Sequence, residues 1–306
     1  MATHPMKLRP GIVHGCPRSG TTFLLSVINA LPHVACMNGT LLSVSIPQIV
    51  HRELPPDVYE ALAVGFERSL NDYLESGRFN SRARALQKWF QSPTGLSGLL
   101  RAAKGQHGVD MLVYKEPFLS FAPGFVLDAF PDAPIIYIHR DGRDVANSLV
   151  RSYGVLTDDE LRHLRSSEVR LGRKVDDRYV PWWVDDGREE EFLSATPYVR
   201  AIWMWKVMVQ RCHEIYAPLT VDHGGNVLII EYEAFMREPE AHGEEILRHL
   251  GQPSSSRFRK RLGAAHSTSI GKHTHRQPSE IREAERIAGD ELRLLGYELT
   301  ESASVS

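Results

Sequence analysis

The sequence predicts an α/β fold with a doubly wound, mainly parallel central sheet, a phosphate-binding loop of the P-loop type and helical insertions. Short apolar runs, typical of strands, alternate with segments of helical periodicity. A loop of small residues at 15–22 separates the first apolar run from the first helical segment. The run at 133–139 is apolar almost without a break, as in strands that are covered on both faces.

The first of these elements surrounds the loop at 15–22. Ile12 and Val13 predict a strand, and the apolar spacing from 23 to 28 predicts the following helix. Unpaired N–H groups and the dipole of a helix N-terminus attract anions there. We therefore expect an anion site, to which Arg18 adds a full charge. The alternative is a strand–turn–helix without a ligand.

The loop nearly matches the P-loop pattern G-x-x-x-x-G-K-[ST]. Gly15, Gly20 and Thr22 fit, but Thr21 stands where the pattern has lysine. That lysine binds the β- and γ-phosphates of a nucleoside triphosphate. Its absence disfavours an ordinary kinase or ATPase and favours phosphate-type binding with the basic residue moved to Arg18.

Bulk properties narrow the class of protein. The 306 residues are 42% hydrophobic and 24% charged, with a net charge of −2, which gives no support to a nucleic-acid partner. The cysteines, Cys16, Cys36 and Cys212, predict neither a disulfide framework nor a zinc site. The N-terminus has no apolar signal region, and no run of about 18 apolar residues occurs. We expect a cytoplasmic protein with no membrane partner.

We expect one domain over residues 1–306, with helical insertions at about 41–110 and 153–194 and a frayed polar tail at 300–306. Segment 31–110 is predicted to be mixed and mostly helical. Apolar periodicity, caps and breakers predict the remaining elements. Strands are expected at 111–117, 133–139 and 226–232. Helices are expected at 57–74, 81–90, 125–130, 142–152, 158–172, 198–218, 239–250 and 278–295, and residues 253–277 are expected to be irregular.

Two pairs of residues predict capping boxes, in which the cap and the third helical residue bond to each other's N–H groups. One pair is Asp141 with Asp144, and the other is Thr157 with Glu160. The second opens a charged helix that we expect to act as a lid.

A second anion site is predicted where the third strand ends. Arg140 leaves the carboxyl edge of the sheet, where ligands of open α/β sheets bind. Ser148 lies on the same face of the following helix by its spacing, so Arg140 and Ser148 can contact one phosphate together. The alternative is that Arg140 and Arg143 only pair with nearby aspartates.

Five short motifs together resemble the sulfotransferase family that uses 3′-phosphoadenylyl sulfate (PAPS). The run PRSGTT at 17–22 resembles its 5′-phosphosulfate loop, and 140–148 resembles its 3′-phosphate motif. YKEPF at 114–118 is similar to a strand of the tyrosylprotein sulfotransferases. YEAF at 232–235 resembles the family's motif whose tyrosine lies near the adenine. SIGK at 269–272 resembles the family's C-terminal segment that contacts the nucleotide. The resemblance extends from residue 11 to residue 297.

The resemblance implies transfer of a sulfonate from PAPS to a hydroxyl or amine of a small molecule, such as an aromatic or glycosylated compound. It implies no metal. Arg18 and Lys115 are implied as catalytic residues. The implied donor-binding residues are Arg18, Ser19, Gly20, Thr21, Thr22, Arg140, Ser148, Tyr232, Gly271 and Lys272.

The general base cannot be carried over. Cytosolic members have a histidine at the position of Pro117, and the run that matches the tyrosylprotein glutamate, 37–40, has no carboxylate. Glu116, His51 and Glu53 are candidates by neighbourhood, while an acidic phenol as acceptor would need less help. A small-molecule P-loop kinase and a nucleotide-binding module without turnover are the rival functions.

The tryptophans near 182 and several histidines are the remaining side chains for which we state an expectation. Trp182 and Trp183 are expected either to stack on the acceptor or to lie in the core. His14 is expected to be a packed histidine. His266 and His273 are expected in a mobile basic loop, together with His275.

Overall fold

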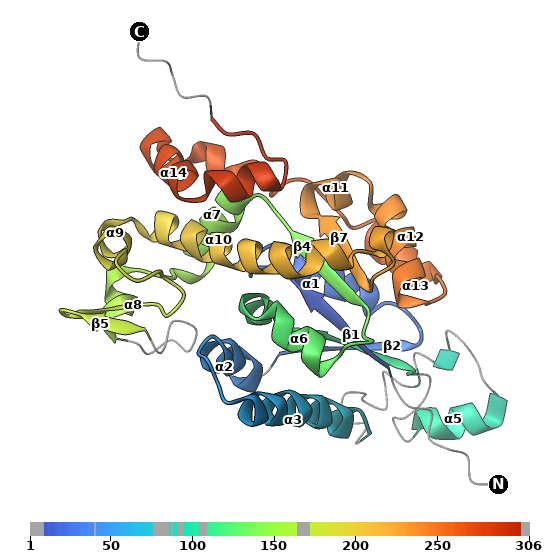
Figure 1. The fold of residues 1–306 in the computed structure, drawn as a ribbon. Coiled ribbons are helices and arrows are strands. Elements are labelled where there is room, and N and C mark those ends of the chain that lie inside the picture. The colour runs from blue at the N-terminus through green and yellow to red at the C-terminus, as the bar shows by residue number, and fades with distance from the viewer. Residues whose placement is uncertain are drawn as a thin grey trace.

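The computed structural model describes residues 9–39, 41–75, 86, 89–90, 95–103, 109–163 and 172–300. At its centre are five parallel strands in the order β2-β3-β1-β4-β7 (Figure 1). Their bounds are β1 Arg9–His14, β2 Val34–Asn38, β3 Met111–Lys115, β4 Ile135–His139 and β7 Val227–Glu231. The doubly wound parallel sheet predicted from the sequence is confirmed.

Strand β2 was not predicted, because its segment was assigned to a mostly helical region. The strand lies at the edge of the sheet, paired only with β3, and its last residues are increasingly exposed. Ala35 and Met37 have little preference for strands, so the segment VACMN gives no strong β signal. Pairing with β3, and not local propensity, makes this segment extended.

Both faces of the sheet are covered by helices. Successive strand residues point to opposite faces, so Val13 packs on one side and Ile12 on the other. The first side holds α1 Thr21–Ile28, α12 Pro239–Leu250 and α13 Ser256–Leu262. The second side holds α3 Pro56–Glu75, α6 Pro123–Ala129 and part of α10 Pro197–Tyr216. Burial on both faces explains why these strands are almost continuously apolar.

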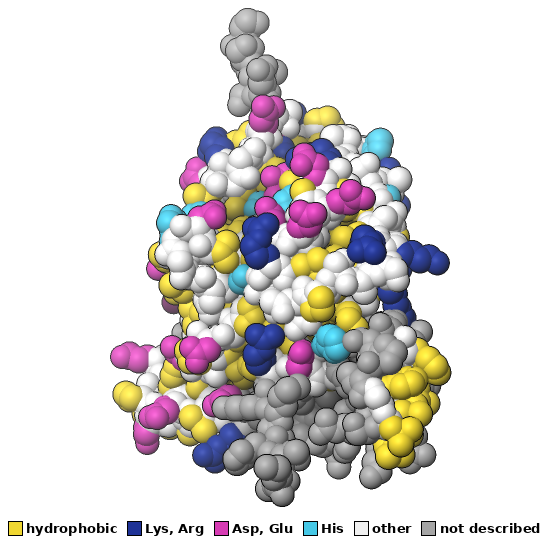
Figure 2. Space-filling model, turned by 90° about the vertical axis from the view of Figure 1, so that its right-hand side faces the viewer, with side chains coloured by type: hydrophobic (Ala, Val, Ile, Leu, Met, Phe, Trp, Pro, Cys, Tyr) yellow, Lys and Arg dark blue, Asp and Glu magenta, His cyan; other side chains and the backbone are white. Residues whose placement is uncertain are grey.

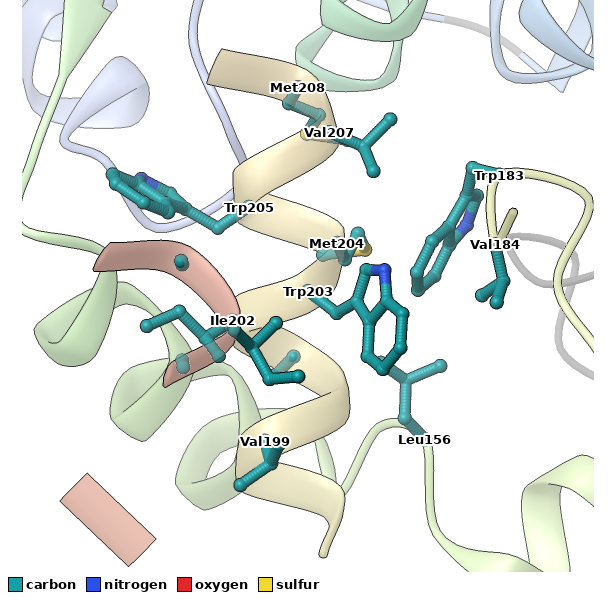
Figure 3. Packing of buried hydrophobic residues seen from close by; sticks show 14 of the residues in the cluster. Leu156, Trp183, Val184, Val199, Ile202, Trp203, Met204, Trp205, Val207 and Met208 are labelled. Carbon is teal, nitrogen blue, oxygen red and sulfur yellow. The ribbon is translucent and has the colours of Figure 1, made fainter. Parts of the chain in front are cut away.

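Besides the two clusters on the faces of the sheet, there is a third hydrophobic cluster. Helix α10 forms it with α7 Gly142–Tyr153 and α14 Pro278–Leu294 (Figure 1). Trp203 of α10 lies toward Trp183, while Trp205 points to the other side of the helix (Figure 3). Trp182 and Trp183 are buried against Phe121, whose ring is stacked on that of Trp183. Of the two expectations for these tryptophans, the structure supports the core.

The remaining elements are shorter. They are α2 Leu41–Val50, α5 Gly95–Ala103, η1 Pro117–Phe121, α8 Asp158–His163, β5 Arg173–Val175, β6 Arg178–Val180, α9 Glu189–Ser194, η2 Ala217–Leu219, η3 Val221–His223, α11 Tyr232–Arg237 and η4 Lys272–His275. The hairpin of β5 and β6 was not predicted. Nor was α13, which begins at a serine cap that we overlooked: Ser255 Oγ accepts a 3.1 Å bond from the N–H of Phe258. Most of the helix predicted at 81–90, the end of that at 158–172 and the tail at 301–306 lie outside the described residues.

The capping box predicted for α7 is half wrong. Asp141 does cap the helix, because its Oδ1 accepts from the N–H of Arg143 at 2.8 Å. The N–H of Asp141, however, donates to Glu233 Oε1 at 3.2 Å, so it is not available to Asp144. At α8, Thr157 Oγ1 accepts from the N–H of Glu160 as expected, but the Glu160 carboxylate bonds to the N–H of Leu156.

The face of the molecule in Figure 2 has no dominant charge among its described residues. Lys and Arg side chains alternate with Asp and Glu over that face (Figure 2). None of the described helices is both long and apolar enough to cross a bilayer. The three cysteines are free.

Candidate active site

A pocket of about 620 Å³ lies at the carboxyl edge of the sheet. The parallel registers bring the ends of β1, β3, β4 and β7 to this one edge, for example Val13 beside Lys115 and His139 beside Glu231. In the strand order, the chain passes from β1 to β2 and β3 on one side of β1 and then to β4 on its other side. Open α/β sheets bind ligands at such a reversal of strand order. Nine predicted residues line the pocket: Arg18, Gly20, Thr21, Thr22, Lys115, Arg140, Ser148, Tyr232 and Lys272.

The loop before α1 is held by close backbone contacts. Gly15 and Gly20 have φ of 148° and 95°, values that favour glycine. A Cβ on Gly20 would lie 2.4 Å from the ring of Tyr232. The N–H of Gly15 donates to Ser120 Oγ at 3.1 Å, and no side chain caps the first N–H groups of α1. The N-terminus of α1 is therefore shaped to receive an anion.

Ser19 differs from the expectation. Its N–H donates to the carbonyl of Cys16 at 3.0 Å, and its side chain is fully buried and does not line the pocket. The loop thus uses this N–H internally, while Gly20, Thr21 and Thr22 line the pocket.

Arg18 connects the two predicted anion sites. Its backbone has φ of 75°, which is uncommon for a residue with a side chain. Its Nε donates to Ser148 Oγ at 3.0 Å, and its guanidinium lies 5.5 Å from the ring centre of Tyr153. Its carbonyl accepts from Arg140 Nη1 at 3.3 Å. The loop at 15–22 and the start of α7 therefore form one wall of charge.

Lys115 ends β3 beside the loop. Its Nζ lies 3.5 Å from Thr22 Oγ1. Burial lowers the pKa of Lys115, although the nearby Glu116 opposes this shift. The ammonium group is thus partly desolvated, a state in which it interacts more strongly with an anion.

Arg140 is supported from several sides. Its guanidinium lies 4.6 Å from the ring centre of Tyr232, and its carbonyl accepts from Trp205 Nε1 at 3.1 Å. Arg143, in contrast, is paired with Asp141 at 2.7 Å and with Glu285 at 2.6 Å. The structural alternative therefore holds for Arg143, whereas Arg140 both pairs with Asp144 at 3.4 Å and lines the pocket.

Residues 268–272 of the C-terminal segment line another side of the pocket. Tyr232 Oη and Ser269 Oγ are 2.8 Å apart, and Lys272 lines the pocket. Gly271 does not line it; its N–H donates to Asp144. His273 also bonds to Asp144 and lies in the 3-10 helix η4, so its segment is not irregular throughout as expected.

The lining is strongly positive. It contains five basic side chains, Arg18, Lys115, Arg140, Arg151 and Lys272, and one acid, Asp144, among the residues that the structure describes. Arg151 was missed, although its position three residues after Ser148 places both on one face of α7. Such a pocket is suited to a ligand with several negative charges.

None of the base candidates lines the pocket. The carboxylate of Glu116 accepts from the N–H of Phe118 at 3.1 Å and so caps η1. The ring of His51 packs on Trp182 with centres 4.3 Å apart, and burial lowers its pKa. Glu53 is exposed. His14 is fully buried, as expected, with Nδ1 2.6 Å from Tyr216 Oη.

The fold and this pocket define an α/β protein with a P-loop-type loop and a positively charged pocket. Residues 10–256 match the sequence profile of the sulfotransferase family, so the chain belongs to that family. None of the curated proteins matches the chain. No group of three or more potential metal ligands occurs within the described residues.

Solved sulfotransferase structures are similar over most of the chain. Sulfotransferase STF9 from Mycobacterium avium has 16% identity and a TM-score of 0.48, covering 98% of this chain and 79% of its own. A sulfotransferase from Alicyclobacillus acidocaldarius has 19% identity and a TM-score of 0.47, covering 95% and 97%. The sulfotransferase domain of the Synechococcus PCC 7002 olefin synthase has 17% and 0.47, covering 98% and 99%. The resemblance to the tyrosylprotein branch stays a prediction.

Proposed function

We propose that the protein transfers the sulfonate of PAPS to a hydroxyl or amine of a small molecule and releases adenosine 3′,5′-bisphosphate. One observation carries this proposal: basic groups line one pocket at two places, around Lys115 and α1 and around Arg140 and Ser148. PAPS has anionic groups at two ends of one nucleoside and would use both places. A volume of about 620 Å³ suits a ligand of this size.

Each basic residue has a proposed role. Arg18, with the N–H groups of Thr21 and Thr22, would hold the 5′-phosphosulfate and stabilise the charge on the leaving phosphate. Lys115 would contact the transferring sulfonate. Arg140 and Ser148 would hold the 3′-phosphate, and Tyr232 would lie near the adenine. Catalysis would depend on positioning for in-line attack, since the sulfonate carries less charge than a γ-phosphate.

The acceptor must lose a proton, and the described lining offers little help. Its one acid, Asp144, is already bonded to Arg140 and to the C-terminal segment. We propose an acceptor that ionises readily, such as an acidic phenol, so that a strong base is not required. The same observation favours, as the second candidate, a module that binds the nucleotide without turnover.

Calorimetry tests donor binding. We expect adenosine 3′,5′-bisphosphate to bind without magnesium and Mg·ATP to bind at least about tenfold more weakly. Magnesium-dependent ATP binding without bisphosphate binding would instead indicate a kinase.

Transfer itself is tested by incubating the protein with PAPS and a panel of phenols, sugars, alcohols and amines. Mass spectrometry detects a sulfonated product. Bisphosphate binding without a product from any acceptor class would favour the non-catalytic module.

A further inference from the structure

Residues 268–276, called the strap below, run along one side of the pocket. Thr268, Ser269 and Lys272 of the strap line it. Ile270 packs partly against the core beneath α1 and Arg276 lies over the ring of Tyr198, whereas Thr268, Lys272, Thr274 and His275 are exposed. The position of the strap therefore depends largely on polar contacts.

One buried carboxylate makes three of these contacts, and others join Ser269 to Arg140 and Tyr232 and Arg276 to Asn147. Asp144, in the first turn of α7, has a side chain that is 1% exposed. Its Oδ2 accepts from the N–H of Gly271 at 2.6 Å, and its Oδ1 accepts from the N–H of His273 at 2.8 Å. The same Oδ1 lies 2.9 Å from His273 Nδ1, and Oδ2 lies 3.4 Å from Arg140 Nη2. Asp144 thus joins the strap to α7 and to the wall that contains Arg140.

A carboxylate suits this task because it accepts several hydrogen bonds and donates none. Burial opposes its ionisation, but the hydrogen bonds from His273 and the charge of Arg140 outweigh burial and lower the pKa of Asp144. A negative charge beside an anion pocket would by itself weaken anion binding. Its presence needs an offsetting benefit, and the contacts to Gly271 and His273 supply one.

We propose that Asp144 is a positioning residue that holds the strap so that Lys272 faces the pocket. This role of Asp144 in the strap does not require a bound ligand. Its effect on binding rests on the proposed function, with the nucleoside bisphosphate end of PAPS as the group that Lys272 meets.

Hydrogen exchange of the ligand-free protein tests the tether. Asp144→Asn keeps the shape but turns one acceptor into a donor, which then faces a backbone N–H. We expect the amides of Gly271 and His273 to exchange at least about tenfold faster, while the interior amides of α7 and β4 keep their protection. Asp290→Asn, an exposed carboxylate on α14, is the matched control. Unchanged exchange at Gly271 and His273 would overturn the proposal.

His273→Ala is the second variant, should Asp144→Asn not fold. It leaves the carboxylate and both backbone N–H donors in place and removes only the imidazole contact. We expect faster exchange at residue 273, by a smaller factor, with α7 unaffected. No change there would also count against the tether.

A double-mutant cycle tests the consequence for binding. We expect Lys272→Ala to weaken adenosine 3′,5′-bisphosphate about tenfold in the native background, and less than about twofold when Asp144→Asn is also present. Equal losses in both backgrounds would show that Asp144 does not act through Lys272, and tighter binding by Asp144→Asn would show that its charge matters more than its contacts. If the native protein bound no bisphosphate, the proposed donor would be wrong, while the exchange result would still decide on the tether.

Discussion

Arg18 Nε donates a 3.0 Å hydrogen bond to Ser148 Oγ, and 130 residues of sequence separate the two. The bond joins the loop before α1 to the second turn of α7, so two motifs that lie far apart in the sequence form one surface. Because Ser148 holds Arg18 toward α7, the guanidinium has a defined position before any ligand arrives.

Arg18→Ala should abolish sulfonate transfer to any acceptor found. The charge that builds on the leaving phosphate would lose its nearest cation, and losing one such donor typically costs about 10²–10³ in kcat. The measurement is kcat by mass spectrometry. Arg282→Ala, on the exposed side of α14, is the control and should keep full activity. Normal turnover by Arg18→Ala would remove our role for this residue.

Arg140→Ala should mainly weaken donor binding. The buried guanidinium would form charge-assisted bonds to the 3′-phosphate, and their loss costs on the order of 2–4 kcal/mol. We expect the Kd of adenosine 3′,5′-bisphosphate, measured by calorimetry, to rise accordingly. A Kd within about twofold of the native value would contradict this site assignment.

Lys115 should give the rate an alkaline limit. Burial lowers its pKa, so the ammonium form is complete at low pH and is lost, as the pH rises, at a lower pH than in free lysine. The pH profile of kcat/KM for PAPS reports the free enzyme and should fall there. In Lys115→Arg the guanidinium stays charged, so the fall should move to higher pH even if the maximal rate is lower. An unmoved limb would assign the titration to another group.

Gly142→Ala should destabilise the protein. An added Cβ would lie 2.5 Å from ring atoms of Trp205, which is fully buried. Overpacking of this kind costs about 1–3 kcal/mol, more than alanine contributes to a helix. Urea unfolding measures the change. Gly65→Ala in α3 is the matched control, since nothing lies within 4 Å of its added Cβ, and it should stabilise by up to about 1 kcal/mol.

Glu116→Gln distinguishes a helix-capping role of Glu116 from a role as the general base. Because the carboxylate accepts from the N–H of Phe118 outside the pocket lining, we expect kcat to stay within a few-fold of native. The loss of charge at the cap should lower the unfolding free energy by up to about 1 kcal/mol. A fall in kcat of about 10² or more, with normal stability, would make Glu116 the base.

The sequence predicted the elements whose signal is local. Four apolar strands, the loop at 15–22 and the long helices with clear caps or breakers were found because burial and capping act within each segment. Edge strand β2 was missed because its conformation depends on pairing with β3. Asp144 was misjudged for a related reason: spacing suggested a local capping box, whereas its partners lie 127 and 129 residues further along the chain. The base was not predictable: among the described residues the one acid that lines the pocket, Asp144, is bonded to Arg140 and to the strap, and no histidine lines the pocket.

The strand order also has a consequence for synthesis. β4 lies between β1 and β7, and β7 is the last strand of the sheet to be translated. Until residues 227–231 leave the ribosome, β4 has an unpaired edge, and its five residues are all buried in the finished protein. Such an edge can pair with another chain. Recombinant yield should therefore depend on how quickly the last quarter of the chain is supplied, for instance on translation speed near β7 and on chaperones that cover β4.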